Sequence, residues 1–177
     1  VISGLDPKLS FLKMVDENDL PSDFVTDIKN FRIRGSSGKV NLALDALPDF
    51  TCLPGDGHHL RGAISISPNY DHLENAYDDA KYGNFSQKPF MDIILPSVLD
   101  PDMAPPGKHV MSCFVQYAPY GINGGWNDQK REAFGDAVVN TIAEYAPNIK
   151  DIILHRQVLS PADIESIFGL TEGNIFH

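Results

Sequence analysis

The stretch Gly38-Lys39-Val40-Asn41-Leu42-Ala43-Leu44-Asp45 decides the fold, because apolar and polar side chains alternate along its whole length. The valine and leucines at positions 40, 42 and 44 share one face, and the residues between them share the other. A period of two is typical of a half-buried β-strand. The sequence therefore predicts a sheet whose best-defined strand lies here.

Four further strands are predicted after this one, at residues 62–67, 90–96, 109–117 and 152–159. A proline-rich connection at residues 100–107 suits two neighbouring antiparallel strands, 90–96 and 109–117. The strands are grouped with turns and do not form strict βαβ units, which favours an α+β fold. We expect a mixed, largely antiparallel sheet with helices packed mainly on one face, in a single domain over residues 1–177.

Helices are predicted where capping residues precede an apolar stripe of helical period. Asp6-Pro7 is an N-cap and N1 pair that opens a short helix with Leu9, Leu12 and Val15 buried. Four more helices are expected: one over residues 21–31, one that Ser67-Pro68 opens and Gly83 ends, the longest over 127–145, and one that Ser160-Pro161 opens and Gly169 ends.

Composition narrows the possible functions. The 177 residues include 14 basic and 24 acidic side chains, a net charge of −10 that disfavours nucleic acid as a partner. No apolar run approaches the roughly 20 residues of a transmembrane segment. The two cysteines, Cys52 and Cys113, form no disulfide pattern and fit a reducing compartment, so we expect a cytoplasmic location.

Most short motifs are better explained as structure than as chemistry. Residues 35–39 read Gly-Ser-Ser-Gly-Lys but are too short for a phosphate loop and continue into a strand. Residues 121–125 contain three glycines without dinucleotide-binding spacing. His58 and His59 are adjacent and lack further ligands, and His109 lies about 13 Å from Cys113 along one strand, so no metal site is expected.

Aromatic residues gather near the three glycines. Tyr117, Tyr120 and Trp126 follow the predicted strand 109–117, where they line a ligand pocket in one interpretation and anchor the core or a loop in the other. Both ends of the chain resemble the interior of a longer protein, since Val1 is not an initiator methionine and residues 164–177 end in apolar, glycine-containing sequence. We expect an excised part of a larger polypeptide.

Several stretches resemble one known family. Residues 36–48, 95–101 with 104–107, 116–120, and 167–170 with 173–177 are similar to phytoene-dehydrogenase-like FAD-dependent oxidoreductases. The resemblance covers nearly the whole chain and is nearest to the branch called pyridine nucleotide-disulfide oxidoreductase domain-containing proteins. In that family an N-terminal Rossmann segment and a C-terminal glycine-rich segment bind FAD, and the region between them forms a substrate domain over the flavin.

The resemblance implies that this chain is the substrate domain, and that its partners are the FAD-binding portion of the same polypeptide and an apolar, isoprenoid-like small molecule. Both flavin motifs are missing here, so no cofactor-binding residue is expected within the chain, which would be inactive alone. Asn174 and His177 are candidates to face the flavin, and Tyr117 and Tyr120 to shape the pocket. Their structural alternatives are a turn amide, a terminal histidine and core aromatics.

No catalytic residue is carried over from the resemblance. Two other functions stay open at this point. One is an autonomous ligand-binding or protein-interaction module without redox activity, and the other is a scaffolding subunit that has lost its chemistry.

Overall fold

The structure, a computed structural model, describes residues 2–176 and is built around one five-stranded sheet. The strand order is β2-β3-β4-β1-β5, and each ladder among these strands is antiparallel. The strands are β1 (Ser37–Leu44), β2 (Ile64–Ile66), β3 (Phe90–Ile94), β4 (His109–Gln116) and β5 (Ile153–Leu159). The predicted α+β fold is confirmed. The predicted sheet was mixed, but in the described residues every pair of neighbouring strands is antiparallel.

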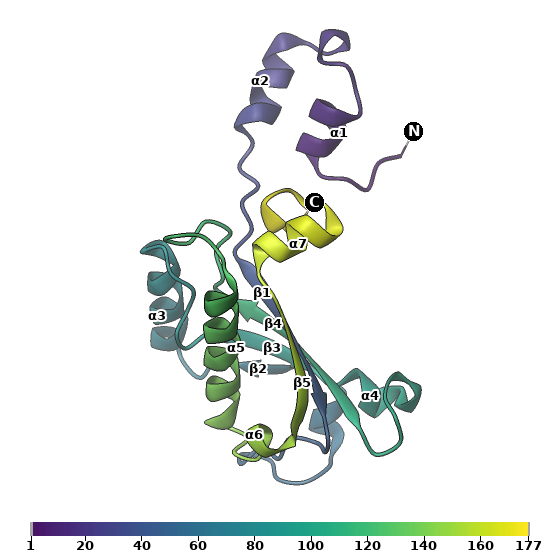
Figure 1. The fold of residues 1–177 in the computed structure, drawn as a ribbon, viewed down its shortest axis with the longest axis vertical. Helices are drawn as coiled ribbons and strands as arrows, with labels where there is room; N and C mark the ends of the chain where they lie inside the picture. The colour runs from purple at the N-terminus through teal and green to yellow at the C-terminus, as the bar shows by residue number, and fades with distance from the viewer. Residues whose placement is uncertain (1, 177) are drawn as a thin grey trace.

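The helices lie mainly on one side of this sheet, as predicted. Figure 1 shows α3 and α5 on the same side of it, with α6 at the lower end of α5. The α-helices are α1 (Pro7–Lys13), α2 (Ser22–Asn30), α3 (Tyr70–Lys81), α4 (Pro96–Leu99), α5 (Asp128–Ala143), α6 (Ile149–Ile152) and α7 (Pro161–Phe168). Short 3₁₀ turns are η1 (Glu17–Asp19), η2 (His58–Arg61), η3 (Pro101–Met103) and η4 (Thr171–Gly173).

The core forms between α5 and the apolar face of the central strands. Val40 of β1 lies opposite Cys113 of β4 and Val158 of β5, and Leu42 lies opposite Met111. Because the side-chain period of a strand is two, this register places the apolar positions of β1 and β4 on one face. The α5 side chains that complete this buried cluster are Phe134, Val138 and Ile142.

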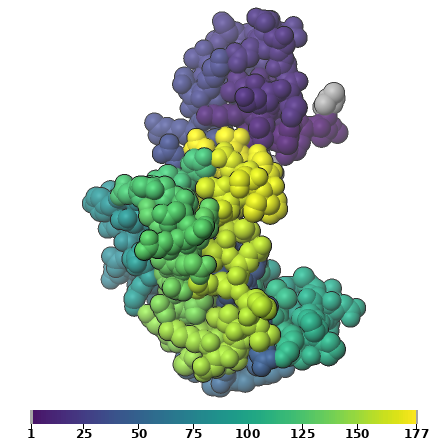
Figure 2. Space-filling model, viewed as in Figure 1, coloured from purple at the N-terminus to yellow at the C-terminus, as the bar shows by residue number. Residues whose placement is uncertain are grey.

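The N-terminal helices differ from the prediction in their burial. Val15 is 39% exposed and α1 has no buried residue. The helix packs against α2 through Phe11 and Phe24, whose rings meet edge to face at 5.0 Å. Figure 2 shows this helix pair, in purple, as a lobe that meets the yellow C-terminal segment. The join includes Asp6, which caps α1 and accepts a 2.7 Å hydrogen bond from the Thr171 hydroxyl.

The start of α3 also differs by a few residues. Ser67-Pro68 was expected to open the helix, but Asn69 is the N-cap, since its side chain accepts a 2.8 Å hydrogen bond from the backbone N–H of His72. An asparagine carbonyl is as good an N-cap acceptor as a serine hydroxyl. The end at Gly83, which has a positive φ, is as predicted.

Candidate functional site

The face of the sheet opposite the core is the main candidate for a functional surface. On β1 the alternation that buries Val40 and Leu42 turns Lys39, Asn41 and Ala43 to this second face, where all three are half-buried. We call it the open face. By strand register it also carries Ser65 of β2, Phe90, Asp92 and Ile94 of β3, Val110, Ser112, Phe114 and Gln116 of β4, Ser37 of β1, and His155, Gln157 and Leu159 of β5.

A row of hydrogen-bonded polar side chains crosses the open face. The Ser112 hydroxyl donates to Asn41 Oδ1 at 2.8 Å, and Asn41 Nδ2 donates to Gln157 Oε1 at 3.0 Å. These three residues lie directly opposite one another on β4, β1 and β5. Cross-strand neighbours on one face are close enough to bond, so the register itself holds the Asn41 amide in a fixed orientation.

A second row, one step along the strands, contains the charges of this face. Lys39 of β1 lies opposite Phe114 of β4, which lies opposite Asp92 of β3. Two strand spacings of about 4.8 Å separate Lys39 from Asp92, so the two do not form an ion pair. Asp92 instead accepts a short hydrogen bond from the Ser65 hydroxyl on β2. Phe114 thus lies between a cation and an anion.

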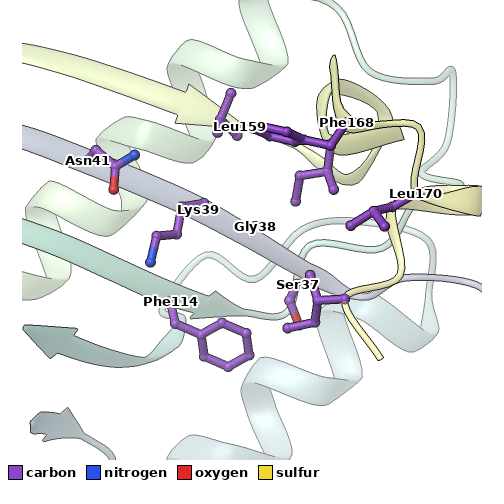
Figure 3. A pocket seen from close by; sticks show the side chains of 10 residues that line it. Ser37, Gly38, Lys39, Asn41, Phe114, Leu159, Phe168 and Leu170 are labelled. Carbon is purple, nitrogen blue, oxygen red and sulfur yellow. The ribbon is translucent and has the colours of Figure 1, made fainter. Parts of the chain in front are cut away.

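The open face contains a pocket of about 430 Å³ where α7 and the segment after it approach β1. This volume is within the ~300–1,000 Å³ range of small-molecule sites. We call it the α7 pocket; Figure 3 shows Lys39 between Asn41 and Phe114, with Phe168 and Leu170 at the other end. Its lining consists of Ser37, Gly38, Lys39, Asn41, Phe114, Leu159, Ile164, Phe168, Leu170 and Ile175, most of whose exposed surface in the pocket is apolar.

A second, shallower hollow of about 270 Å³ adjoins the α7 pocket. Asn41 lines both, and the second hollow continues along the face past Ala43, Val110 and His155. A twisted sheet is naturally concave along one diagonal. The open face can therefore hold an elongated molecule that runs from α7 across Asn41 toward β5.

Capping chemistry positions α7 over its pocket. The Ser160 hydroxyl caps the helix and Asp163 completes a capping box, as the sequence predicted, and Gly169 ends the helix in the left-handed conformation. Asp163 also accepts hydrogen bonds of 2.8 and 3.0 Å from Arg131 Nε of α5. Burial raises the pKa of Asp163, but the hydrogen bonds from Arg131 and Ser160 and the Arg131 charge outweigh it, so the pKa is lowered.

Glu165 fixes the other side of α7. It accepts a 2.6 Å hydrogen bond from the Tyr120 hydroxyl and a 2.7 Å hydrogen bond from the backbone N–H of Glu172. The hydrogen bond to Glu165 raises the pKa of Tyr120, and burial and the charges of Glu165 and Glu172 act in the same direction. Glu172 in turn pairs with Arg34, just before β1. The carboxylates of α7 and η4 are thus already engaged and do not reach the pocket as free charges.

The residues that the sequence singled out are dispersed. The Tyr117 ring packs on Tyr77 of α3 with centroids 5.5 Å apart, and Tyr120 bonds Glu165, so neither is among the residues that line the α7 pocket or its neighbour. Asn174 lines a small adjacent hollow of about 90 Å³ that shares Ser37 with the α7 pocket, and its Oδ1 accepts a 2.7 Å hydrogen bond from the N–H of Phe176. His177 lies outside the described residues.

Trp126 is a structural anchor. Its ring stacks with Phe85 and meets Phe134 edge to face, and its Nε1 donates to the carbonyl of Pro119 at 2.9 Å. Lys39 and Asn41 line the pocket but are not among the residues predicted from the sequence. The signal for them is the polar half of the alternating strand, which by itself indicates only the less buried side.

The glycine-containing segments offer no cradle for a dinucleotide. Residues 35–39 run into β1, and a Cβ on Gly35 would lie 2.5 Å from the carbonyl oxygen of Gly173, so the backbone there is already closely covered. In the loop 121–125 the Lys130 ammonium donates hydrogen bonds to the carbonyl oxygens of Asn123 and Gly125. FAD does not fit the phosphate-binding requirement at either place.

Two further findings concern the described residues. Residues 2–176 contain no group of three or more His, Cys, Asp or Glu side chains arranged to hold a metal ion. Within the same part of the chain no helix has the length and apolar character to cross a bilayer.

The chain is similar in sequence to known proteins along its whole length. The chain is similar to pyridine nucleotide-disulfide oxidoreductase domain-containing protein 2. It is 42% identical to the mouse protein over 188 aligned positions and 40% identical to the rat protein over 185, and the whole chain is covered in both. The chain spans 32% of the length of each of these curated relatives. No protein-family model matches it.

Proposed function

We propose that the chain is the substrate-binding part of an FAD-dependent oxidoreductase resembling phytoene dehydrogenase, and that its open face forms one wall of the pocket over the flavin. The observation that carries the proposal is the unequal covering of the sheet. One face is closed by the core under α5, whereas the other presents half-buried side chains and two adjoining hollows. The α7 pocket has a mostly apolar exposed surface with few polar groups, which is typical of a substrate site.

The relatives support this assignment in a second way. Their name describes an oxidoreductase domain, and about two thirds of each lies outside the aligned part, which leaves room for a separate nucleotide-binding portion. In this proposal FAD is held by that other portion. The flavin would supply hydride-transfer chemistry, while the open face binds and orients an apolar donor and excludes water.

The visible absorption spectrum of the full-length protein, compared with that of the 177-residue chain, tests the proposal. We expect flavin bands in the full-length protein alone. Absence of flavin from both would overturn the proposal and favour an autonomous ligand-binding or protein-interaction module.

A pair of tryptophan substitutions tests the placement of the open face. Phe114→Trp puts an electron-rich ring on the proposed pocket wall, and Tyr82→Trp puts the same ring at an exposed position after α3. Flavin fluorescence in the full-length protein should be quenched by Phe114→Trp and unchanged by Tyr82→Trp. Equal effects of the two variants would contradict a flavin facing this surface.

A further inference from the structure

Lys39 is the unusual residue of the α7 pocket. It is half-buried among apolar side chains, and within residues 2–176 no carboxylate oxygen lies within 4.0 Å of its ammonium. A cation at a mostly apolar pocket wall can be complemented by an anionic group of a bound molecule. The lack of a carboxylate partner within residues 2–176 is notable in a chain with 24 acidic and 14 basic side chains, where acidic partners are abundant.

The other polar groups of the pocket are already committed. Asn41 bonds Ser112 and Gln157, and Ser37 accepts a hydrogen bond from Gln116 at 3.2 Å. The nearest charged neighbour by strand register, Asp92, bonds Ser65 and lies two strands away. The hydrogen-bond donors of the Lys39 ammonium therefore stay free for a ligand.

The apolar lining lies at the other end of the same pocket. Phe168 is 62% exposed and Ile175 is 38% exposed, and together with Leu159 and Leu170 they form a surface that extends from Lys39 toward α7. Figure 3 shows this separation, with Lys39 beside Phe114 and Phe168 near Leu159. A molecule with one anionic end and one apolar chain would satisfy both regions at once.

We propose that the α7 pocket binds an amphipathic carboxylate, with the carboxylate on the Lys39 ammonium and the hydrocarbon chain against Leu159, Phe168, Leu170 and Ile175. This inference rests on the proposed function, since it names the substrate class of the same surface. A pure hydrocarbon would leave the Lys39 ammonium without a partner. A carboxylate would complement its charge.

Binding of dodecanoate and of dodecanol to the full-length protein, measured by calorimetry below their micelle concentrations, tests the proposal. The wild type should bind dodecanoate at least ~10-fold more tightly than dodecanol, a difference of about 1.4 kcal/mol. Lys39→Gln should remove this preference and leave dodecanol unchanged, whereas Lys39→Arg should keep it. Lys150→Gln, at an exposed position on α6, is the matched control.

A separate variant tests the contact with the hydrocarbon part of the ligand. Phe168→Ala should weaken dodecanoate and dodecanol by the same factor, because it removes apolar contact alone. Equal binding of dodecanoate by the wild type and Lys39→Gln, tighter binding of dodecanol, or no binding of either would overturn the proposal. If the full-length protein contains flavin but does not prefer dodecanoate to dodecanol, the proposed ligand class is wrong and the redox function stands. If it contains no flavin but shows a preference that depends on Lys39, the redox function is wrong and the ligand class stands.

Discussion

The hydroxyl of Tyr120 donates a 2.6 Å hydrogen bond to Oε2 of Glu165, and this contact joins the loop after β4 to the helix that borders the α7 pocket. The same carboxylate accepts the backbone N–H of Glu172, so one side chain orients both the helix and the turn that follows it. The position of the pocket wall therefore depends on a contact between residues 45 positions apart in the sequence.

Tyr120→Phe should lower the free energy of unfolding at pH 8 by about 1–2 kcal/mol, because a hydrogen bond to a carboxylate is lost. The raised pKa of Tyr120 means that its protonated form stabilises the fold. This contribution is full below the ordinary tyrosine value near pH 10 and is lost as the pH rises through the folded-state pKa. Urea denaturation should show the difference between the wild type and the variant shrinking as the pH rises above the ordinary tyrosine value, and Tyr70→Phe, at an 87% exposed position, should have no effect.

Asp163→Asn should destabilise the protein by about 2–3 kcal/mol at pH 7, because it leaves Arg131 partly buried without its main partner. Asp128→Asn removes another contact of Arg131, but the Asp128 side chain is fully exposed, so we expect a much smaller effect than for Asp163→Asn. Since the pKa of Asp163 is lowered, its stabilisation is present above about pH 4 and disappears as the pH falls through the folded-state value. Equal destabilisation by the two variants at pH 7 would contradict the prediction that Asp163 is the more important partner of Arg131.

Gly38→Ala should cost about 1–3 kcal/mol in unfolding free energy, as overpacking of a core typically does. A Cβ at Gly38 would lie 2.6 Å from the ring of Phe134, which packs directly over this strand position. Gly62 has open space around the corresponding point, so Gly62→Ala is the control and should change stability by less than about 0.5 kcal/mol. Thermal unfolding of the two variants gives the comparison, and a neutral Gly38→Ala would show that the ring moves aside freely.

Thiol labelling should separate the two cysteines. Cys113 is buried in the core, and burial raises the pKa of its thiol to about 12, whereas Cys52 is exposed. The thiolate is the reactive form. A disulfide reagent at pH 8 should therefore modify one thiol, Cys52, in the native protein and both in urea; rapid native labelling of Cys52→Ser would contradict the burial of Cys113.

Local patterns were enough for most elements of the fold. The alternation at residues 37–44, the N-cap at Asn127 before α5 and the capping box at Ser160 each depend on neighbours within a few residues. Such signals act over one strand or one helical turn, so they are visible in the sequence. The burial of α1 was overestimated because an apolar stripe does not say which surface it will meet.

The site was harder to predict, because its residues are brought together by pairing between distant segments. Tyr117 and Tyr120 are close in sequence to one end of β4, yet one packs on α3 and the other on α7. Lys39 carries no motif of its own. Its significance comes from Phe168 and Leu170, which are more than 120 positions away and line the same pocket.

The sequence by itself determined the α+β class, the strand with one apolar face and the ends of α7, since each follows from periodicity and capping over short distances. Only the tertiary structure decided that the polar face of β1 is hollowed rather than simply solvated. The order β2-β3-β4-β1-β5 and the return of α7 onto β1 create that hollow. Strand order and helix docking are set by the combined burial of many side chains, which no local pattern records.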